Sequence, residues 1–111
     1  MSAVPELTPT EFRERWPDAD AARAPILLDV REPEELAIAA VSDVVHIPMG
    51  QIPARLAELD RDKPIVCMCH GGVRSLRVAE FLSAHGFEHV FNLSGGIDAW
   101  SQQIDPDIPR Y

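Results

Sequence analysis

The sequence predicts an α/β fold in which a mostly parallel, five-stranded sheet is flanked by helices on both faces. Strand signals and helix signals alternate along all 111 residues, without a linker, a repeat or a low-complexity segment. The strand signals are short apolar runs, which are typical of parallel strands buried on both faces. In such sheets, ligands bind beyond the carboxyl ends of the strands, so the functional site is expected there.

The first third of the chain carries signals for one helix and two strands. Thr8-Pro-Thr-Glu11 has the form of a capping box with proline at the first helical position, and it predicts a helix that runs to about Trp16. A short strand is expected before this helix, near Ala3. The apolar run from Ile26 to Val30 predicts a buried strand.

The middle of the chain is expected to add two helices and one strand. Residues 33–40 begin with proline and predict a short helix, and Val44 to Ile47 predicts a strand. Ile52, Leu56 and Leu59 recur at the spacing of one helix face, which predicts a second helix in this region.

A strand and a longer helix follow. Residues 65–69 are mostly apolar or β-favouring and predict a strand. Residues 74–85 predict a helix that Gly86 can close, because glycine is common just past a helix end. The side chains expected on its buried face are Val78, Ala79, Phe81 and Leu82.

The last strand and the last helix are predicted at residues 90–93 and at residues 96–103. Trp100 is expected to anchor this final helix in the core. Residues 105–111 contain too many prolines for a helix and are expected to pack as an extended tail.

Composition limits the possible functions. With 46% apolar and 25% charged residues, the chain is expected to form one soluble domain over residues 1–111. No apolar run approaches the roughly 20 residues that span a bilayer. The start lacks the pattern of a secretory signal. We therefore expect no membrane partner and a cytoplasmic location. The formal net charge of −8 disfavours nucleic acid as a partner.

Cys69 is the strongest candidate for a reactive residue. It stands where the carboxyl end of a strand meets a helix start, whose unpaired N–H groups and positive dipole end stabilise a thiolate. Gly71 and Gly72 allow the loop to turn with its amides facing inward as an anion-binding nest. Arg74 is a cation at the unfavourable end of the dipole, which favours a role in substrate binding. His70 faces either the pocket mouth or solvent.

Other residues with chemically capable side chains are expected to be structural. Cys67 precedes Cys69 by two residues, and side chains two apart on a strand stand parallel, with Cα atoms about 6.5–7 Å apart, which suits a disulfide poorly. We therefore predict that Cys67 packs in the core. Asp29 and Arg31 are expected to hold a turn. No metal site is expected.

Four segments resemble the motifs of rhodanese-type sulfurtransferases. The Cys-x-x-Gly-x-Arg-Ser pattern of residues 69–75 resembles the active-site loop of that family. Residues 26–33, with the sequence ILLDVREP, resemble its first signature strand and turn. His46-Ile-Pro48 resembles its second motif, and residues 94–100 resemble its closing motif. The order and spacing agree over about 75 residues, which makes a chance likeness improbable.

The resemblance implies a rhodanese-like fold and a double displacement. The Cys69 thiolate would attack the outer sulfur of a thiosulfate-like anion, sulfite would leave, and cyanide or a thiol would take the sulfur from the Cys69 persulfide. A lowered thiol pKa would replace a general base. No cofactor is implied. The residues implied to bind the substrate are His70, Gly71, Gly72, Val73 and Arg74.

Three alternatives stay open. A persulfide carrier that delivers sulfur to a protein acceptor, in cofactor or tRNA thiolation, fits the same residues. A phosphatase or arsenate reductase of this fold would place arginine six positions after the cysteine, whereas four residues lie between Cys69 and Arg74 and six between Cys67 and Arg74. This spacing favours sulfur over phosphate. The presence of Cys69 disfavours the third alternative, a non-catalytic binding module.

Overall fold

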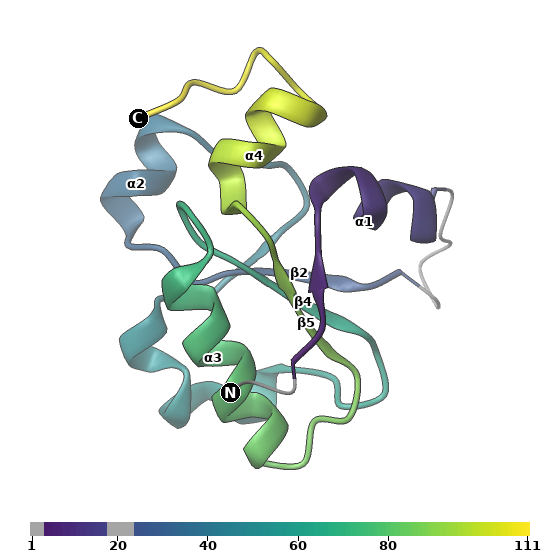
Figure 1. Ribbon diagram of the computed structural model, residues 1–111. Helices are drawn as coiled ribbons and strands as arrows, with labels where there is room; N and C mark the ends of the chain where they lie inside the picture. Colours follow the sequence, from purple (N-terminus) through teal and green to yellow (C-terminus); the bar gives the residue numbers. More distant parts are fainter. Residues whose placement is uncertain (1–3, 18–23) are drawn as a thin grey trace.

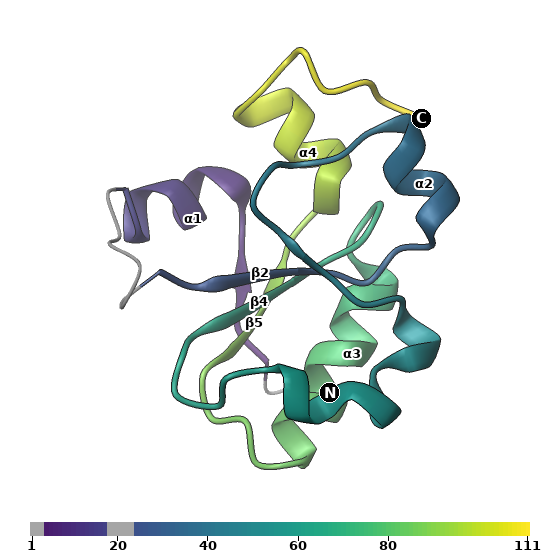
Figure 2. The same ribbon diagram turned by 180° about the vertical axis from the view of Figure 1, so that it is seen from behind.

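Five parallel strands form one central sheet in the computed structural model, which describes residues 4–17 and 24–111 (Figure 1 and Figure 2). Within these residues every strand pairing is parallel, which confirms the predicted sheet. The order across the sheet is β1-β5-β4-β2-β3, so β4 is the central strand. The strands are β1 (Glu6–Leu7), β2 (Ile26–Asp29), β3 (Val45–His46), β4 (Ile65–Met68) and β5 (Val90–Leu93).

Helices cover both faces of this sheet. α1 (Pro9–Arg15) and α4 (Gly96–Gln103) lie on one face, and α3 (Val73–Ala84) lies on the other (Figure 1). Two 3₁₀ helices, η1 (Met49–Gln51) and η2 (Pro53–Glu58), share the face of α3. No helix in the described parts of the chain combines the length and the apolar character needed to cross a bilayer.

The core consists of two layers because alternate strand residues point to opposite faces. Leu28 and Cys67 are buried in the cluster beneath α3, whereas Leu27 and Val66 are buried in the cluster beneath α1 and α4. Trp100 of α4 is buried in the second cluster, as predicted. The sheet is therefore covered on both faces, and a ligand-binding site is expected beyond the carboxyl ends of its strands.

The predicted start of the first helix is confirmed in detail. The N–H of Glu11 donates to the Thr8 hydroxyl at 3.1 Å, and the N–H of Thr8 donates to the Glu11 carboxylate at 2.9 Å. The strand expected near Ala3 lies outside the described residues, and the strand that precedes this helix is β1.

The helix predicted from Ile52, Leu56 and Leu59 is wrong in type. Arg55 has φ −121° and ψ 19°, which is not helical, so the segment forms η1 and η2 instead of one α-helix. The apolar face is nevertheless right, since Ile52 and Leu59 are buried in the core. α2 (Pro33–Ile38) ends two residues before the predicted limit, because Ala39 is extended.

The C-terminal tail returns along α4 to the carboxyl end of the sheet. It contains a turn and no helix, as its prolines predict. Ile108 is buried, and its carbonyl accepts a hydrogen bond from the Ser101 hydroxyl at 2.6 Å. Arg110 pairs with Asp98 at 2.8 Å. The chain end thus lies beside α2, where Figure 1 draws it in yellow.

Candidate active site

Cys69 directly follows β4, and the loop that it opens leads into α3 (Figure 1). The first turn of α4 holds this loop: the N–H of Ile97 donates to the Cys69 carbonyl at 2.9 Å, and that of Asp98 to the His70 carbonyl at 3.2 Å. These carbonyls face α4, which leaves the amides of the loop to face the sulfur. Gly96 permits this close approach, because its φ is +58° and a Cβ there would overlap the Cys69 carbonyl oxygen.

Hydrogen bonds from the loop converge on the Cys69 sulfur. The N–H of Gly72 lies 3.1 Å from Sγ, and the Ser75 hydroxyl in the first turn of α3 lies 3.3 Å from it. Burial alone would raise the pKa of the Cys69 thiol. The Ser75 hydroxyl and the amides of Ser75, Gly72 and Gly71 outweigh burial and lower that pKa below its ordinary value. The loop therefore favours the thiolate.

Gly72 is the loop position whose backbone requires glycine. Its φ is +108°, and a Cβ there would lie 3.3 Å from the Gly95 nitrogen. Its carbonyl accepts a hydrogen bond from the Asn92 side chain at 3.0 Å, which fixes the turn. Packing makes no such demand at Gly71, where an added Cβ would meet no atom within 4 Å.

We expect Ser75→Ala to shift the pH dependence of Cys69 reactivity upward. The change removes a hydrogen bond that lowers the pKa of Cys69 and that contributes about 1 kcal/mol, so the thiolate should form about 0.5–1 pH unit higher. The alkylation rate with iodoacetamide, measured against pH, gives this inflection. Ser101→Ala is the control, because Ser101 is also a buried serine but bonds to Ile108. Equal inflections in both variants would contradict the role of Ser75.

Cys67 is fully buried in the same cluster as Cys69, and both thiols are free. Burial, with a further contribution from the charge of Cys69, raises the pKa of Cys67 far above its ordinary value. Cys67 therefore stays a neutral thiol, and the prediction that it packs in the core is confirmed.

Arg74, which the sequence places at the rim as a substrate-binding residue, is held by Glu35 of α2. Two guanidinium N–H groups donate to the two oxygens of the Glu35 carboxylate, at 2.8 and 2.9 Å. This bidentate bond lowers the pKa of Glu35 to about 2. The carboxylate therefore stays ionised and paired at neutral pH.

The His70 side chain turns toward the tail. Its ring stacks on the ring of Tyr111, with centroids 4.1 Å apart and planes at 12°. The Tyr111 hydroxyl accepts a hydrogen bond from Arg31 at 2.9 Å. Val73, the other predicted substrate-binding side chain, is 70% exposed at the start of α3. The predicted residues thus gather at one loop, with an aromatic contact on one side.

Asp29 and Arg31 hold the turn after β2, as predicted. Both side chains are fully buried, and Arg31 donates to the Asp29 carboxylate at 2.7 and 3.0 Å. Arg31 also donates to the carbonyls of Glu35 and Ala39, and its own carbonyl accepts a hydrogen bond from the His46 ring at 2.7 Å. The pair therefore positions α2, and with it Glu35, against the loop.

Sequence reasoning assigned no role to three residues of this site: Ser75, Glu35 and Tyr111. Ser75 could have been found, because it lies three residues after Gly72, within the first turn of the helix whose start binds the sulfur. Glu35 is separated from Arg74 by 39 residues, and Tyr111 from Arg31 by 80 residues. No local pattern connects such distant partners.

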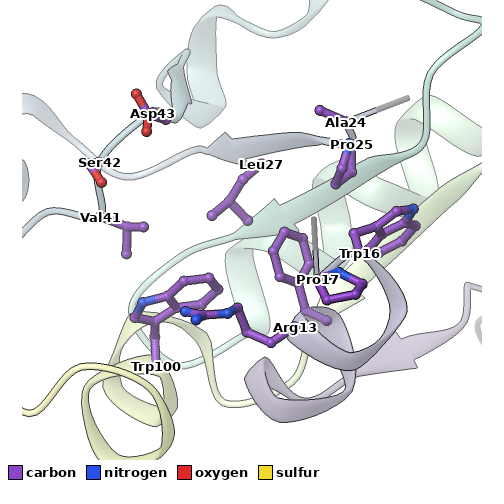
Figure 3. A pocket seen from close by; sticks show the side chains of 11 residues that line it. Arg13, Trp16, Pro17, Ala24, Pro25, Leu27, Val41, Ser42, Asp43 and Trp100 are labelled. Atoms are coloured by element: carbon purple, nitrogen blue, oxygen red, sulfur yellow. The ribbon is translucent and has the colours of Figure 1, made fainter. Parts of the chain in front are cut away.

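A separate pocket of about 360 Å³ lies on the face of the sheet that α1 and α4 cover (Figure 3). Trp16, Trp100, Arg13 and Asp43 are among the residues that line it. Its lining includes no cysteine. Phe12, Leu27 and Val41 of the lining belong to the cluster beneath α1 and α4, whereas Cys69 belongs to the other cluster. This pocket therefore takes no part in chemistry at Cys69. Among the described residues, no three His, Cys, Asp or Glu side chains gather as a metal site would require.

Residues 8–103 match the rhodanese-like domain family. "Putative sulfurtransferase YtwF" from Bacillus subtilis is 44% identical over 80 residues, which cover 72% of this chain and 77% of that protein. "Putative sulfur carrier protein YrkF", from the same organism, is 35% identical over 104 residues. This match covers 94% of the present chain and 55% of YrkF, so the chain spans about half of that longer relative.

The fold is also similar to a solved structure. The crystal structure of a rhodanese-like domain protein from Staphylococcus aureus superposes with a TM-score of 0.81 at 29% sequence identity. The superposition covers 97% of this chain and 99% of that one. The likeness thus extends over nearly the whole of both chains.

Proposed function

The chain belongs to the rhodanese-like domain family, and we propose that it is a sulfurtransferase that carries sulfane sulfur on Cys69 as a persulfide. The observation that carries this proposal is the set of hydrogen-bond donors around the sulfur: the Gly72 amide and the Ser75 hydroxyl both donate to Sγ of Cys69. These donors favour the thiolate, which is the nucleophilic form of cysteine. They also suit the negative terminal sulfur of a persulfide.

In the first half-reaction, the Cys69 thiolate attacks the outer sulfur of a donor. With thiosulfate, an Sγ–S bond forms, the S–S bond of the donor breaks, and sulfite leaves with that electron pair. The product is an anionic persulfide on Cys69, so charge and atoms balance without an oxidant. The backbone amides act as an oxyanion hole does, with fixed donors aimed at the developing negative charge.

In the second half-reaction, a nucleophile takes the outer sulfur. Cyanide or a thiolate attacks this sulfur, the bond to Sγ breaks, and its electron pair restores the Cys69 thiolate. Thiocyanate or a new persulfide leaves. We include a protein thiol among the acceptors, which the name of the YrkF relative supports. We place the reaction in a reducing compartment such as the cytoplasm, because the thiolate must stay reduced between turnovers.

Mass spectrometry of the intact protein tests this proposal. After incubation with thiosulfate or with a small-molecule persulfide, we expect the protein to gain the mass of one sulfur atom, located on Cys69. Subsequent cyanide should remove this mass and yield an equal amount of thiocyanate. If the reduced, folded protein gains no sulfur from either donor, the proposal is wrong.

A further inference from the structure

The Glu35 carboxylate binds the guanidinium group of Arg74, which an anionic sulfur donor would need. The Arg74–Glu35 bond is bidentate, and the two side chains are only 36% and 22% exposed, so water screens the pair less than it would a surface pair. The pKa of Glu35, at about 2, keeps its charge in place at neutral pH. The positive charge at the rim is therefore neutralised from within the protein.

Two other arginines near the loop are also paired. Arg31 is fully buried with Asp29, and Arg110 is bonded to Asp98. Arg77 is exposed one turn farther along α3, where it lines a separate apolar groove with Phe81. With a net charge of −8, the protein offers a dianion little attraction.

The chemistry of the donor makes this neutralisation important. Thiosulfate arrives with two negative charges, and sulfite departs with two, so this donor needs a cation in addition to the amides. A persulfide of an organic thiol releases a thiolate with one charge, for which fewer donors suffice. The stacked rings of His70 and Tyr111 beside the loop also suit the organic part of a thiol better than they suit the charged SO₃ group of thiosulfate.

We propose that Glu35 is a specificity-determining residue that holds Arg74 away from the donor and thereby selects organic or protein persulfides over thiosulfate. This inference rests on the proposed persulfide chemistry of Cys69. The Cys69 thiolate attacks the outer sulfur of R–S–SH, an Sγ–S bond forms, and the S–S bond of the donor breaks, with its electron pair leaving on the R–S group. The products are a protonated Cys69 persulfide and the thiolate R–S⁻.

Glu35→Gln tests the proposal directly. Glutamine keeps an oxygen that can accept the hydrogen bond from the Glu32 N–H at the start of α2, but it removes the charge that holds Arg74. We expect kcat/KM for thiosulfate to rise about tenfold, which corresponds to about 1.4 kcal/mol. The kcat/KM for the persulfide of 2-mercaptoethanol should change less than about twofold.

Two further variants separate this effect from a change in net charge. Glu34→Gln removes the same charge from an exposed neighbour on α2 and should leave both donors unchanged. Glu35→Gln combined with Arg74→Ala should lose the gain in thiosulfate activity, because the gain requires a released guanidinium. Circular dichroism of each variant checks that α2 and α3 remain folded.

Failure of this inference differs from failure of the proposed function. If wild-type protein forms the Cys69 persulfide but Glu35→Gln shows no gain with thiosulfate, the role of Glu35 is wrong and the sulfurtransferase assignment stands. The same conclusion follows if wild-type protein prefers thiosulfate to the organic persulfide. If neither donor places sulfur on Cys69 in any variant, the proposed function itself is wrong.

Discussion

Cys69→Ser should abolish sulfur transfer, with a loss of about a thousandfold or more in the rate of thiocyanate formation. A serine hydroxyl has a far higher pKa than a thiol, so the donors from Gly72 and Ser75 cannot ionise it at neutral pH. Its oxygen also cannot form a persulfide. The fold should remain, because the substitution changes one atom at a position directly after β4 whose carbonyl is bound by the Ile97 N–H of α4. Intact mass spectrometry should show no added sulfur.

Cys67→Ser is the matched control, since it makes the same atomic change two residues earlier, within β4. Cys67 is fully buried and stays a neutral thiol, so this variant should keep most of the activity of the native protein. Burial of the new hydroxyl costs about 1–2 kcal/mol of stability. An inactive Cys67→Ser together with an active Cys69→Ser would reverse the assignment of the nucleophile.

Much of the fold follows from local sequence signals. The capping box at Thr8 is fully formed, β5 has its predicted bounds, and α3 begins one residue from the predicted start. These signals are reliable because a strand–loop–helix unit needs its apolar runs and its turn glycines in fixed places. The same signals located Cys69, because both the strand end and the helix start can be read from a short stretch of sequence.

The remaining features depend on contacts between distant parts of the chain. The sequence suggested Arg74 as a substrate-binding residue, but Glu35 binds its guanidinium group, and Arg31 in turn binds the Glu35 carbonyl of α2. The tail could be recognised as non-helical, but the sequence does not show that Arg110 pairs with Asp98 or that Tyr111 stacks on His70. Contacts between side chains that are distant in the sequence therefore determine the surroundings of Arg74 and His70, which local sequence patterns do not predict.

Asp29→Ala should cause the largest loss of stability, about 3–5 kcal/mol in the free energy of unfolding. Both members of the Asp29–Arg31 pair are fully buried, so the variant leaves a guanidinium without its carboxylate in the interior. Urea unfolding followed by circular dichroism measures the loss. Because Arg31 also binds the Glu35 carbonyl and the Tyr111 hydroxyl, the remaining folded protein should lose order around α2 and the tail.

A double variant distinguishes an unpaired charge from a cavity as the cause. Asp29→Ala combined with Arg31→Met removes the charge and retains an apolar side chain of similar length. It should regain about half of the lost stability, because the Ala39 carbonyl still loses its donor. If the double variant is no more stable than Asp29→Ala, the packing of the Asp29 side chain dominates. If the single variant loses less than about 1 kcal/mol, Arg31 has found another anion, and Glu35, whose pKa Arg31 helps to lower, is a candidate.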